Sequence, residues 1–241
     1  MDIASSRKPL PSVWKTFERV INGRVRKFWI QDLPEDQIEV ALDLMREYYL
    51  RDEPINKALN ILEDEISTSC FRQIWRGLFL QGYSLACYTK IENGENKIVA
   101  VNCCIRKLSG EPDDREKYIK GECLNKVYEL TKYVKSLRDP LEIGIHEYLT
   151  GMGLATISEF RGHKIGLEML HARKPLCIAS GLKASITAFT AHASQKLAEK
   201  AGFKDFISIT FDEIEKINPS LKIPNINVYS ERVRYMYILY E

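Results

Sequence analysis

The sequence predicts a single-domain α/β protein in which helices flank a mixed central β-sheet. Its 241 residues are 45% apolar and 28% charged, which is the composition of a globular chain with a sizeable core. An Asn93-Gly94 pair between two apolar segments indicates a β-hairpin. In the last hundred residues strand patterns alternate with helical ones, which is typical of crossover connections in a mixed sheet.

The N-terminal part of the chain combines an irregular segment with helices. Residues 1–25 are basic and predicted to be irregular, and residues 26–30 form a short strand. Asp32 is a suitable N-cap for a helix that ends near Asp52, because Pro54 disfavours the helical conformation at the residue before it. The spacing of apolar residues predicts two further helices, at 55–66 and 67–80.

The middle of the chain is predicted to form the hairpin and a long helix. Strands at 83–91 and 97–107 flank the Asn93-Gly94 turn, and the second contains a continuous apolar run expected of a strand buried on both faces. Apolar residues at helical spacing then predict a helix over 119–137, which ends before Pro140.

The C-terminal part begins with a glycine-containing strand at 145–157. Glycine inside a strand often marks a bulge or a close approach by a ligand. A helical stretch follows from Arg161 to about Ser180, and Pro175 is predicted to kink or break it. The remaining predicted elements are a strand at 184–189, a helix at 192–201, a strand at 203–211 and a final strand at 228–240.

Composition excludes several functional classes. A formal charge of +2 argues against a protein that coats nucleic acid, although a local basic pocket for a small polyanion remains possible. No stretch resembles a signal peptide or a membrane span. The six cysteines form no CxxC pair and no zinc-finger spacing, so we expect reduced thiols, no metal and a cytoplasmic protein.

The segment from Met152 to Leu170 carries the strongest local signal for a binding site. A strand leads through Arg161-Gly162-His163-Lys164-Ile165-Gly166 into a helix. Backbone amides at a helix N-terminus bind anions, and Lys164 would add a full charge. An ordinary strand-to-helix turn is the alternative. The segment is neither a Walker A loop nor a GxGxxG dinucleotide loop.

This segment resembles motif A of the GCN5-related N-acetyltransferases (GNATs), whose pattern is R/Q-x-x-G-x-G/A. Arg161, Ile165 and Gly166 match it, whereas Lys164 replaces its first glycine. A helix N-terminus asks for a helical φ at Lys164, which a residue with a side chain can adopt.

Three further segments resemble the insect arylalkylamine N-acetyltransferases. Residues 48–56 match the aromatic-x-x-Asp-Glu-Pro-Leu-Asn segment of that family. Residues 190–194, followed by 200–203, match its Ser-x-x-Tyr-Ser and Lys-x-Gly-Phe segments, with Ala193 in place of the tyrosine. Residues 154–157 lie where that family has Leu-Ser-Val-Asp.

The resemblance implies a GNAT domain over residues 26–241 that uses acetyl-CoA as co-substrate. Glu53 would be the general base that takes the proton of the amine, and Ser194 and Thr190 would assist near the thiolate or in a proton relay. Tyr48, Asp52 and His192 would contact the amine. The implied acetyl-CoA residues are Leu154, Ala155, Thr156, Arg161, Gly162, His163, Lys164, Ile165 and Gly166.

Each of these residues also has a structural interpretation. Glu53 and Asp52 could be solvated acids at a helix end, Tyr48 and the strand residues could pack in the core, and Thr190 and Ser194 could cap a helix. No cysteine lies in a matched motif, so direct attack by the amine is favoured over an acyl-cysteine route.

The leading hypothesis is an N-acetyltransferase, expected to be a monomer, that acetylates a small arylalkylamine such as dopamine, serotonin or tyramine. Its expected partners are the amine and acetyl-CoA, with no nucleic acid and no membrane. The alternatives are acetylation of a polyamine or agmatine, acetylation of a protein amine, and a CoA-binding module that has lost catalysis.

Overall fold

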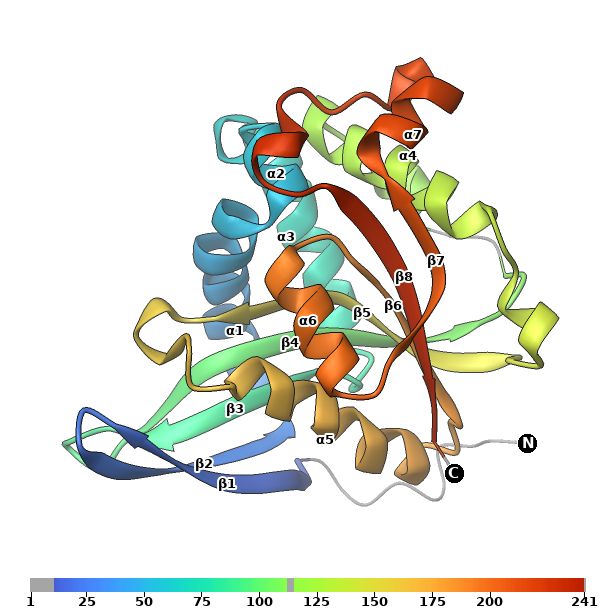
Figure 1. Cartoon of the computed structure of the whole chain (residues 1–241). Coiled ribbons are helices and arrows are strands. Elements are labelled where there is room, and N and C mark those ends of the chain that lie inside the picture. The colour runs from blue at the N-terminus through green and yellow to red at the C-terminus, as the bar shows by residue number, and fades with distance from the viewer. Residues whose placement is uncertain (1–10, 112–114, 241) are drawn as a thin grey trace.

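The computed structural model describes residues 11–111 and 115–240, which form one mixed sheet with helices on both faces (Figure 1). The sheet order is β1-β2-β3-β4-β5-β6-β8-β7. Neighbouring strands are antiparallel except β5 and β6, which are parallel. The strands are β1 (Val13–Ile21), β2 (Arg24–Asp32), β3 (Leu85–Lys90), β4 (Asn96–Leu108), β5 (Glu147–Thr156), β6 (Ala184–Phe189), β7 (Lys204–Thr210) and β8 (Arg232–Leu239).

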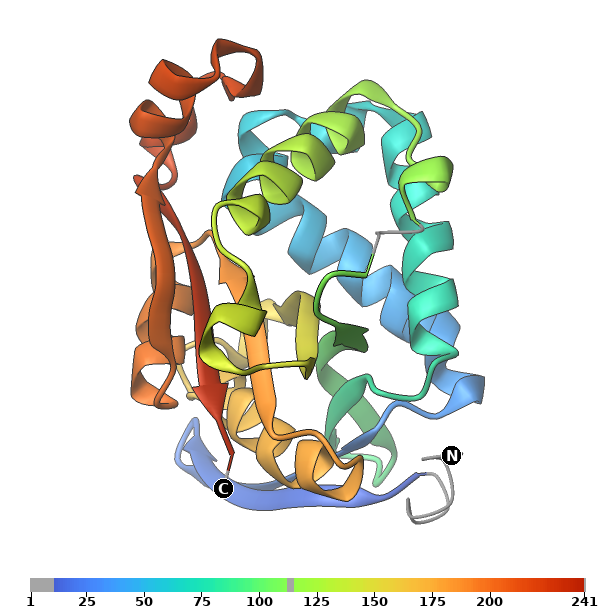
Figure 2. The same ribbon diagram turned by 90° about the vertical axis from the view of Figure 1, so that its right-hand side faces the viewer.

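The helices divide between the two faces of the sheet, as the rotated view shows (Figure 2). One face packs against α1, α3 and α4, and the other against α5 and α6. The helices are α1 (Ile38–Leu44), α2 (Pro54–Ala58), α3 (Glu65–Phe79), α4 (Glu122–Ser136), α5 (Ile165–Ala179), α6 (His192–Lys200) and α7 (Phe211–Ile217). No described helix is long and apolar enough to cross a bilayer.

The N-terminal region corrects one prediction. Residues 13–25 are not irregular, because β1 pairs with β2 in an antiparallel hairpin at the edge of the sheet. The turn uses Asn22 and Gly23, both at positive φ, which is the chemistry of a tight hairpin turn. The part of the predicted irregular segment at 1–10 lies outside the described residues.

The helices also depart from the prediction at two places. The helix predicted to end near Asp52 begins as α1 and continues as a π-helical segment, Met45–Leu50, before the chain breaks at Pro54. Helix α5 runs unbroken through Pro175, so the predicted break does not occur. Ala172 before Pro175 and Leu176 after it are buried in the core beneath the helix, and this packing offsets the lost backbone hydrogen bond.

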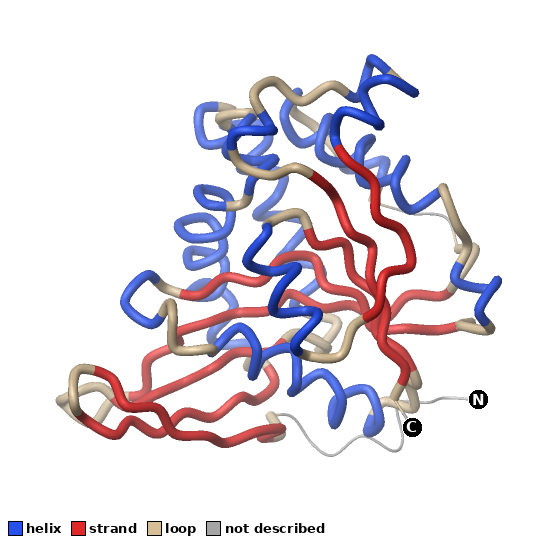
Figure 3. Tube along the Cα trace, viewed as in Figure 1, coloured by secondary structure: helices blue, strands red, loops and turns tan. Residues whose placement is uncertain are grey.

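The strands β5 and β6 separate soon after they meet. Their parallel pairing is limited to Leu149 and Ser185, and the two strands then diverge (Figure 3). Strand β5 also contains a bulge, because the register against β4 shifts between Asn102–Leu154 and Cys104–Gly151. Gly153 lies in this bulge with a φ of +124°, a conformation that residues with side chains rarely adopt. The predicted glycine bulge is therefore present.

Candidate active site

Glu53 stands at the break between the π-helical segment and α2, with its carboxylate buried. As the N-cap of α2, it accepts a hydrogen bond on Oε2 from the Asn56 N–H at 2.8 Å. Its Oε1 accepts a second bond, at 2.6 Å, from the hydroxyl of Thr190, 137 residues further along the chain. Burial raises the pKa of Glu53, and these hydrogen bonds oppose the rise. A raised pKa is a property of carboxylates that act as bases near neutral pH.

Asp52 faces the donor loop, by which we mean residues 158–166 between β5 and α5. Its carboxylate forms ion pairs with Arg51, at 2.8 Å, and with Arg161, at 2.6 Å. These pairs hold the pKa of Asp52 below its usual range, and Arg51 has the largest lowering effect. The Tyr48 ring lies under both guanidinium groups, 5.2 Å from Arg51 and 5.8 Å from Arg161. The residues predicted to bind the amine thus adjoin a residue predicted to bind the donor.

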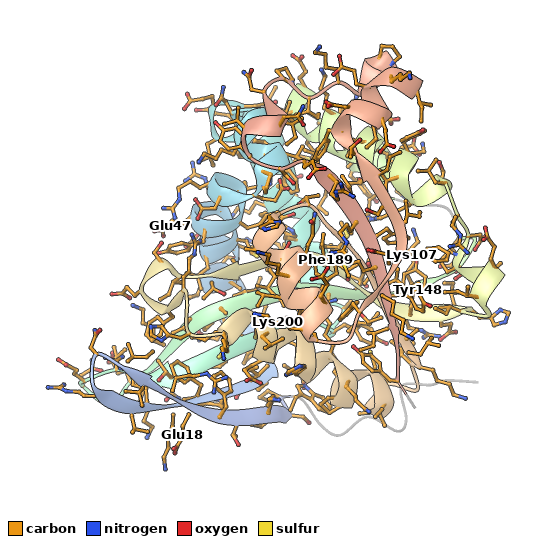
Figure 4. All side chains as sticks on the ribbon, viewed as in Figure 1. Glu18, Glu47, Lys107, Tyr148, Phe189 and Lys200 are labelled. Carbon is orange, nitrogen blue, oxygen red and sulfur yellow. The ribbon has the colours of Figure 1, made fainter. Side chains whose placement is uncertain are left out.

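Tyr49 connects Glu53 to the bulge of β5. Its carbonyl accepts the Glu53 N–H at 2.9 Å, and its ring packs edge-on against Trp75. A β-carbon at Gly153 would lie 2.5 Å from the Met45 methyl group and 3.3 Å from this ring, and the φ of +124° disfavours any side chain, so the position favours glycine. Burial raises the pKa of Tyr49, and the nearby Glu53 carboxylate raises it further. Glu47, in the same π-helical segment, is exposed to solvent (Figure 4).

The donor loop ends at the N-terminus of α5, and its geometry corrects the expectation for Lys164. This residue caps the helix with φ of +60° and ψ of 19°, which is left-handed rather than helical. The turn needs that conformation to enter the helix, and the Lys164 carbonyl accepts the first helical N–H groups, from Leu167 and Glu168. Among the described residues, the N–H groups of Ile165 and Gly166 have no acceptor. They remain available to an anion.

Two groups of the donor loop already form hydrogen bonds within the protein. The Arg161 Nε donates to the Thr156 carbonyl at 2.9 Å, and the His163 carbonyl accepts from Arg19 at 3.0 Å. Ile165 is buried in the core, as is Ala155 on β5. The remaining predicted residues are the exposed Gly162 and Lys164, the partly buried Leu154 and Thr156, and the buried Gly166.

Thr190, His192 and Ser194, predicted to lie together near the start of α6, have different surroundings in the structure. Thr190 reaches Glu53, as described above. The Ser194 hydroxyl donates to the Ala191 carbonyl at 2.8 Å within the first turn of the helix. His192 is exposed and faces a polar pocket of about 350 Å³ whose lining, among the described residues, includes Arg232 and Arg234 but not Glu53. The structure thus brings only Thr190 to the carboxylate.

Comparison with known proteins gives a clear result only for solved structures. No family model and no curated protein matches the chain. The provisionally assigned arylalkylamine N-acetyltransferase 7 of the yellow fever mosquito Aedes aegypti is 29% identical to it. That match has a TM-score of 0.85 and covers 97% of this chain and 98% of the mosquito chain. The chain has the GNAT fold.

More distant structures share this GNAT fold. Arylalkylamine N-acetyltransferase 2 of Aedes aegypti is 18% identical, with a TM-score of 0.72 over 89% of this chain and 99% of its own. The polyamine N-acetyltransferase of Drosophila melanogaster is 14% identical, with a TM-score of 0.70 over 88% and 99%. The predicted fold and the resemblance to insect arylalkylamine N-acetyltransferases are confirmed.

Three buried polar residues near the candidate site were not predicted from the sequence. Asn56 is buried, and neither polar atom of its side chain has a partner among the described residues. Asn102 donates to the Gly153 carbonyl at 2.8 Å, and Arg173 donates to Asn102 at 3.0 Å. Asn56 ends the matched motif at 48–56 and could have been noticed there. An arginine among the apolar residues of α5 was the only signal for Arg173.

The cysteines are all free thiols. Cys103 lies near Tyr49, and burial raises its pKa, which makes it a poor nucleophile. Within residues 11–111 and 115–240, no three His, Cys, Asp or Glu side chains gather as a metal site would require.

Proposed function

We propose that this protein is an acetyl-CoA-dependent N-acetyltransferase that acetylates a small primary amine of the arylalkylamine class. The observation that carries the proposal is the buried Glu53 carboxylate, held between α2 and Thr190. An alkylammonium has a pKa of about 10.4, so holding the amine neutral at pH 7.4 costs about 4 kcal/mol. A buried carboxylate with a raised pKa can take that proton, directly or through a water molecule.

The residues present fit acetyl-CoA as the co-substrate. The free N–H groups of Ile165 and Gly166 and the exposed charge of Lys164 suit a pyrophosphate at the N-terminus of α5. Leu154 and Thr156, on the diverging part of β5, would offer backbone groups to the pantetheine arm. When bound, acetyl-CoA supplies the thioester whose acetyl group is transferred to the amine.

The acceptor side fits an aromatic amine better than a polyamine. Two cations, Arg51 and Arg161, flank the Tyr48 ring, and Asp52 is already paired with both. A second ammonium group of a polyamine would meet this positive charge, whereas an aryl ring would not. The unpartnered amide of Asn56, next to Glu53 in α2, would suit a polar group of the amine or a bound water.

The decisive experiment combines calorimetric titration with CoA and a thiol-release assay over a panel of aryl, indole, guanidino and polyamine substrates. We expect CoA binding and turnover of an aryl or indole amine. We also expect Glu53→Gln to lower kcat by about 100-fold or more, because a general base contributes that much. Glu63→Gln, an exposed acid nearby, is the matched control and should keep full activity.

Other outcomes would redirect the proposal. CoA binding without turnover of any amine would indicate a module that has lost catalysis. Turnover confined to polyamines or to peptide amines would show that the acceptor class is wrong. Full activity of Glu53→Gln at neutral pH would show that another group takes the proton.

A further inference from the structure

Arg173 is a buried cation that the proposed mechanism does not yet use. It lies two turns into α5 with 1% of its surface exposed. Its Nε donates to the Asn102 Oδ1 at 3.0 Å, and its Nη1 donates to the Thr187 hydroxyl at 2.8 Å and the Ser185 hydroxyl at 3.3 Å. These partners are neutral, and so is the buried Cys104 thiol that also contacts the guanidinium, because burial raises its pKa. No described acid forms an ion pair with Arg173. An always-charged guanidinium is unfavourable in such a place unless negative charge reaches it.

The contacts of Arg173 place this charge where β5 and β6 begin to separate. Its partners belong to β4 and β6, and its Nη2 occupies the space that a side chain at Gly151 of β5 would need. The Gly151 N–H donates to the Thr187 hydroxyl at 3.0 Å, which is the same hydroxyl that Arg173 contacts. The guanidinium therefore lies against the innermost part of the diverging strands.

The same network reaches the bulge of β5. Asn102 accepts from Arg173 on Oδ1 and donates through Nδ2 to the Gly153 carbonyl at 2.8 Å. On the other face of the sheet, the Trp75 indole donates to the Met152 carbonyl at 3.0 Å. Two side chains thus fix the carbonyls of the bulge, and one of them is held by Arg173.

We propose that Arg173 stabilises the negative charge that builds on the CoA sulfur during acetyl transfer, and that it positions the bulge of β5 through Asn102. This inference rests on the proposed function. In the transfer, the amine nitrogen bonds to the acetyl carbon, and the electron pair of the breaking carbon–sulfur bond stays on sulfur. The amine proton goes to Glu53. A fixed positive charge in a site that excludes water stabilises this negative charge on sulfur, and the protein does not have to reorganise as the charge builds.

The test follows the thiol of bound CoA by the ultraviolet absorbance of its thiolate as pH is varied. CoA is titrated alone and bound to the wild type, Arg173→Met, Arg173→Lys and Lys174→Met. The last variant is the matched control, because it removes a neighbouring exposed charge from the same helix. Calorimetry first establishes that CoA binds each protein.

We expect the thiol of CoA bound to the wild type and to Lys174→Met to ionise at a lower pH than that of free CoA. Arg173→Lys should keep part of this shift, and Arg173→Met should lose it. Arg173→Met should also lower kcat by about 10- to 100-fold, with a much smaller change in the KM for CoA. A purely structural role would lower stability and leave the thiol titration unchanged.

Two results would overturn the inference. One is a CoA thiol that ionises at the same pH in the wild-type complex as in free CoA. This measurement uses only the wild type, so it tests the inference even if Arg173→Met does not fold. The other is an Arg173→Met variant that keeps the wild-type shift and kcat. Failure of CoA to bind the wild type would instead overturn the proposed function, so the two failures are distinguishable.

Discussion

The acceptor side and the donor loop of the candidate site are built in opposite ways. On the proposed acceptor side, side chains would carry the chemistry, and Glu53 is fixed by hydrogen bonds from Asn56 and Thr190. In the donor loop, the free groups are the backbone N–H groups of Ile165 and Gly166, and the Ile165 side chain is buried in the core. Chemistry carried by side chains is sensitive to one substitution, whereas chemistry carried by backbone tolerates many.

This difference explains why the unusual Lys164 is compatible with the proposed function. The loop needs a left-handed residue at this position, and lysine adopts that conformation at some energetic cost. The amides that follow still lie at the start of α5. No comparable replacement is conceivable for Glu53, because its carboxylate itself would accept the proton.

The largest expected effect is the pH dependence set by Glu53. Burial raises its pKa, so kcat/KM should fall about tenfold per pH unit below a midpoint that lies above the ordinary value of about 4.3. Glu53→Gln should abolish this acidic limb, as measured by pH–rate profiles with one amine kept well below its KM. A midpoint at or below the ordinary value would argue against a buried carboxylate as the base.

The same raised pKa predicts that the stability of the protein falls as pH rises, whereas its activity rises. Ionising a buried acid opposes folding, so the contribution of Glu53 is present below its unfolded pKa and is lost as pH rises through its folded pKa. The difference in melting temperature, Glu53→Gln minus wild type, should therefore increase on the order of a few degrees as pH rises from the unfolded pKa of about 4.3 to the raised folded pKa. A difference that is constant with pH would contradict the burial of a carboxylate.

A smaller effect is expected at Thr190. Its hydroxyl stabilises the ionised form of Glu53, so Thr190→Val should raise the pKa of Glu53 further. The acidic limb should move to higher pH by about one unit, so activity on that limb should fall by up to about tenfold and be restored at alkaline pH. Thr190→Ser keeps the hydroxyl and should retain the wild-type profile. A loss in Thr190→Val that is equal at every pH would indicate a role other than supporting the base.

The two regions also differ in how far the sequence alone could predict them. Local patterns predicted the β3–β4 hairpin, β6 and α6, because turn chemistry and apolar spacing determine such elements. Resemblance located Glu53, but its contact with Thr190 joins residues 137 positions apart and required the fold. The hydrogen bonds of Arg173 span β4 and β6, and no spacing in one helix indicates such partners.

The smallest expected effect, and the one that tests the donor loop, is at Lys164. Lys164→Gly relieves a left-handed φ of +60°, so we expect a gain of about 1 kcal/mol in stability, or roughly 2–4 °C in melting temperature. It also removes an exposed charge, which is worth at most about 1 kcal/mol, so CoA should bind about two- to fivefold more weakly by calorimetry. Raising the salt concentration should reduce this difference.

Lys164→Asn separates the two contributions, because asparagine tolerates the left-handed conformation but carries no charge. It should weaken CoA binding as much as Lys164→Gly while stabilising the protein less. If either variant binds CoA more tightly than the wild type, Lys164 obstructs the donor loop. The backbone would then bind the phosphates despite this side chain, and the contrast between the two sides of the site would be sharper still.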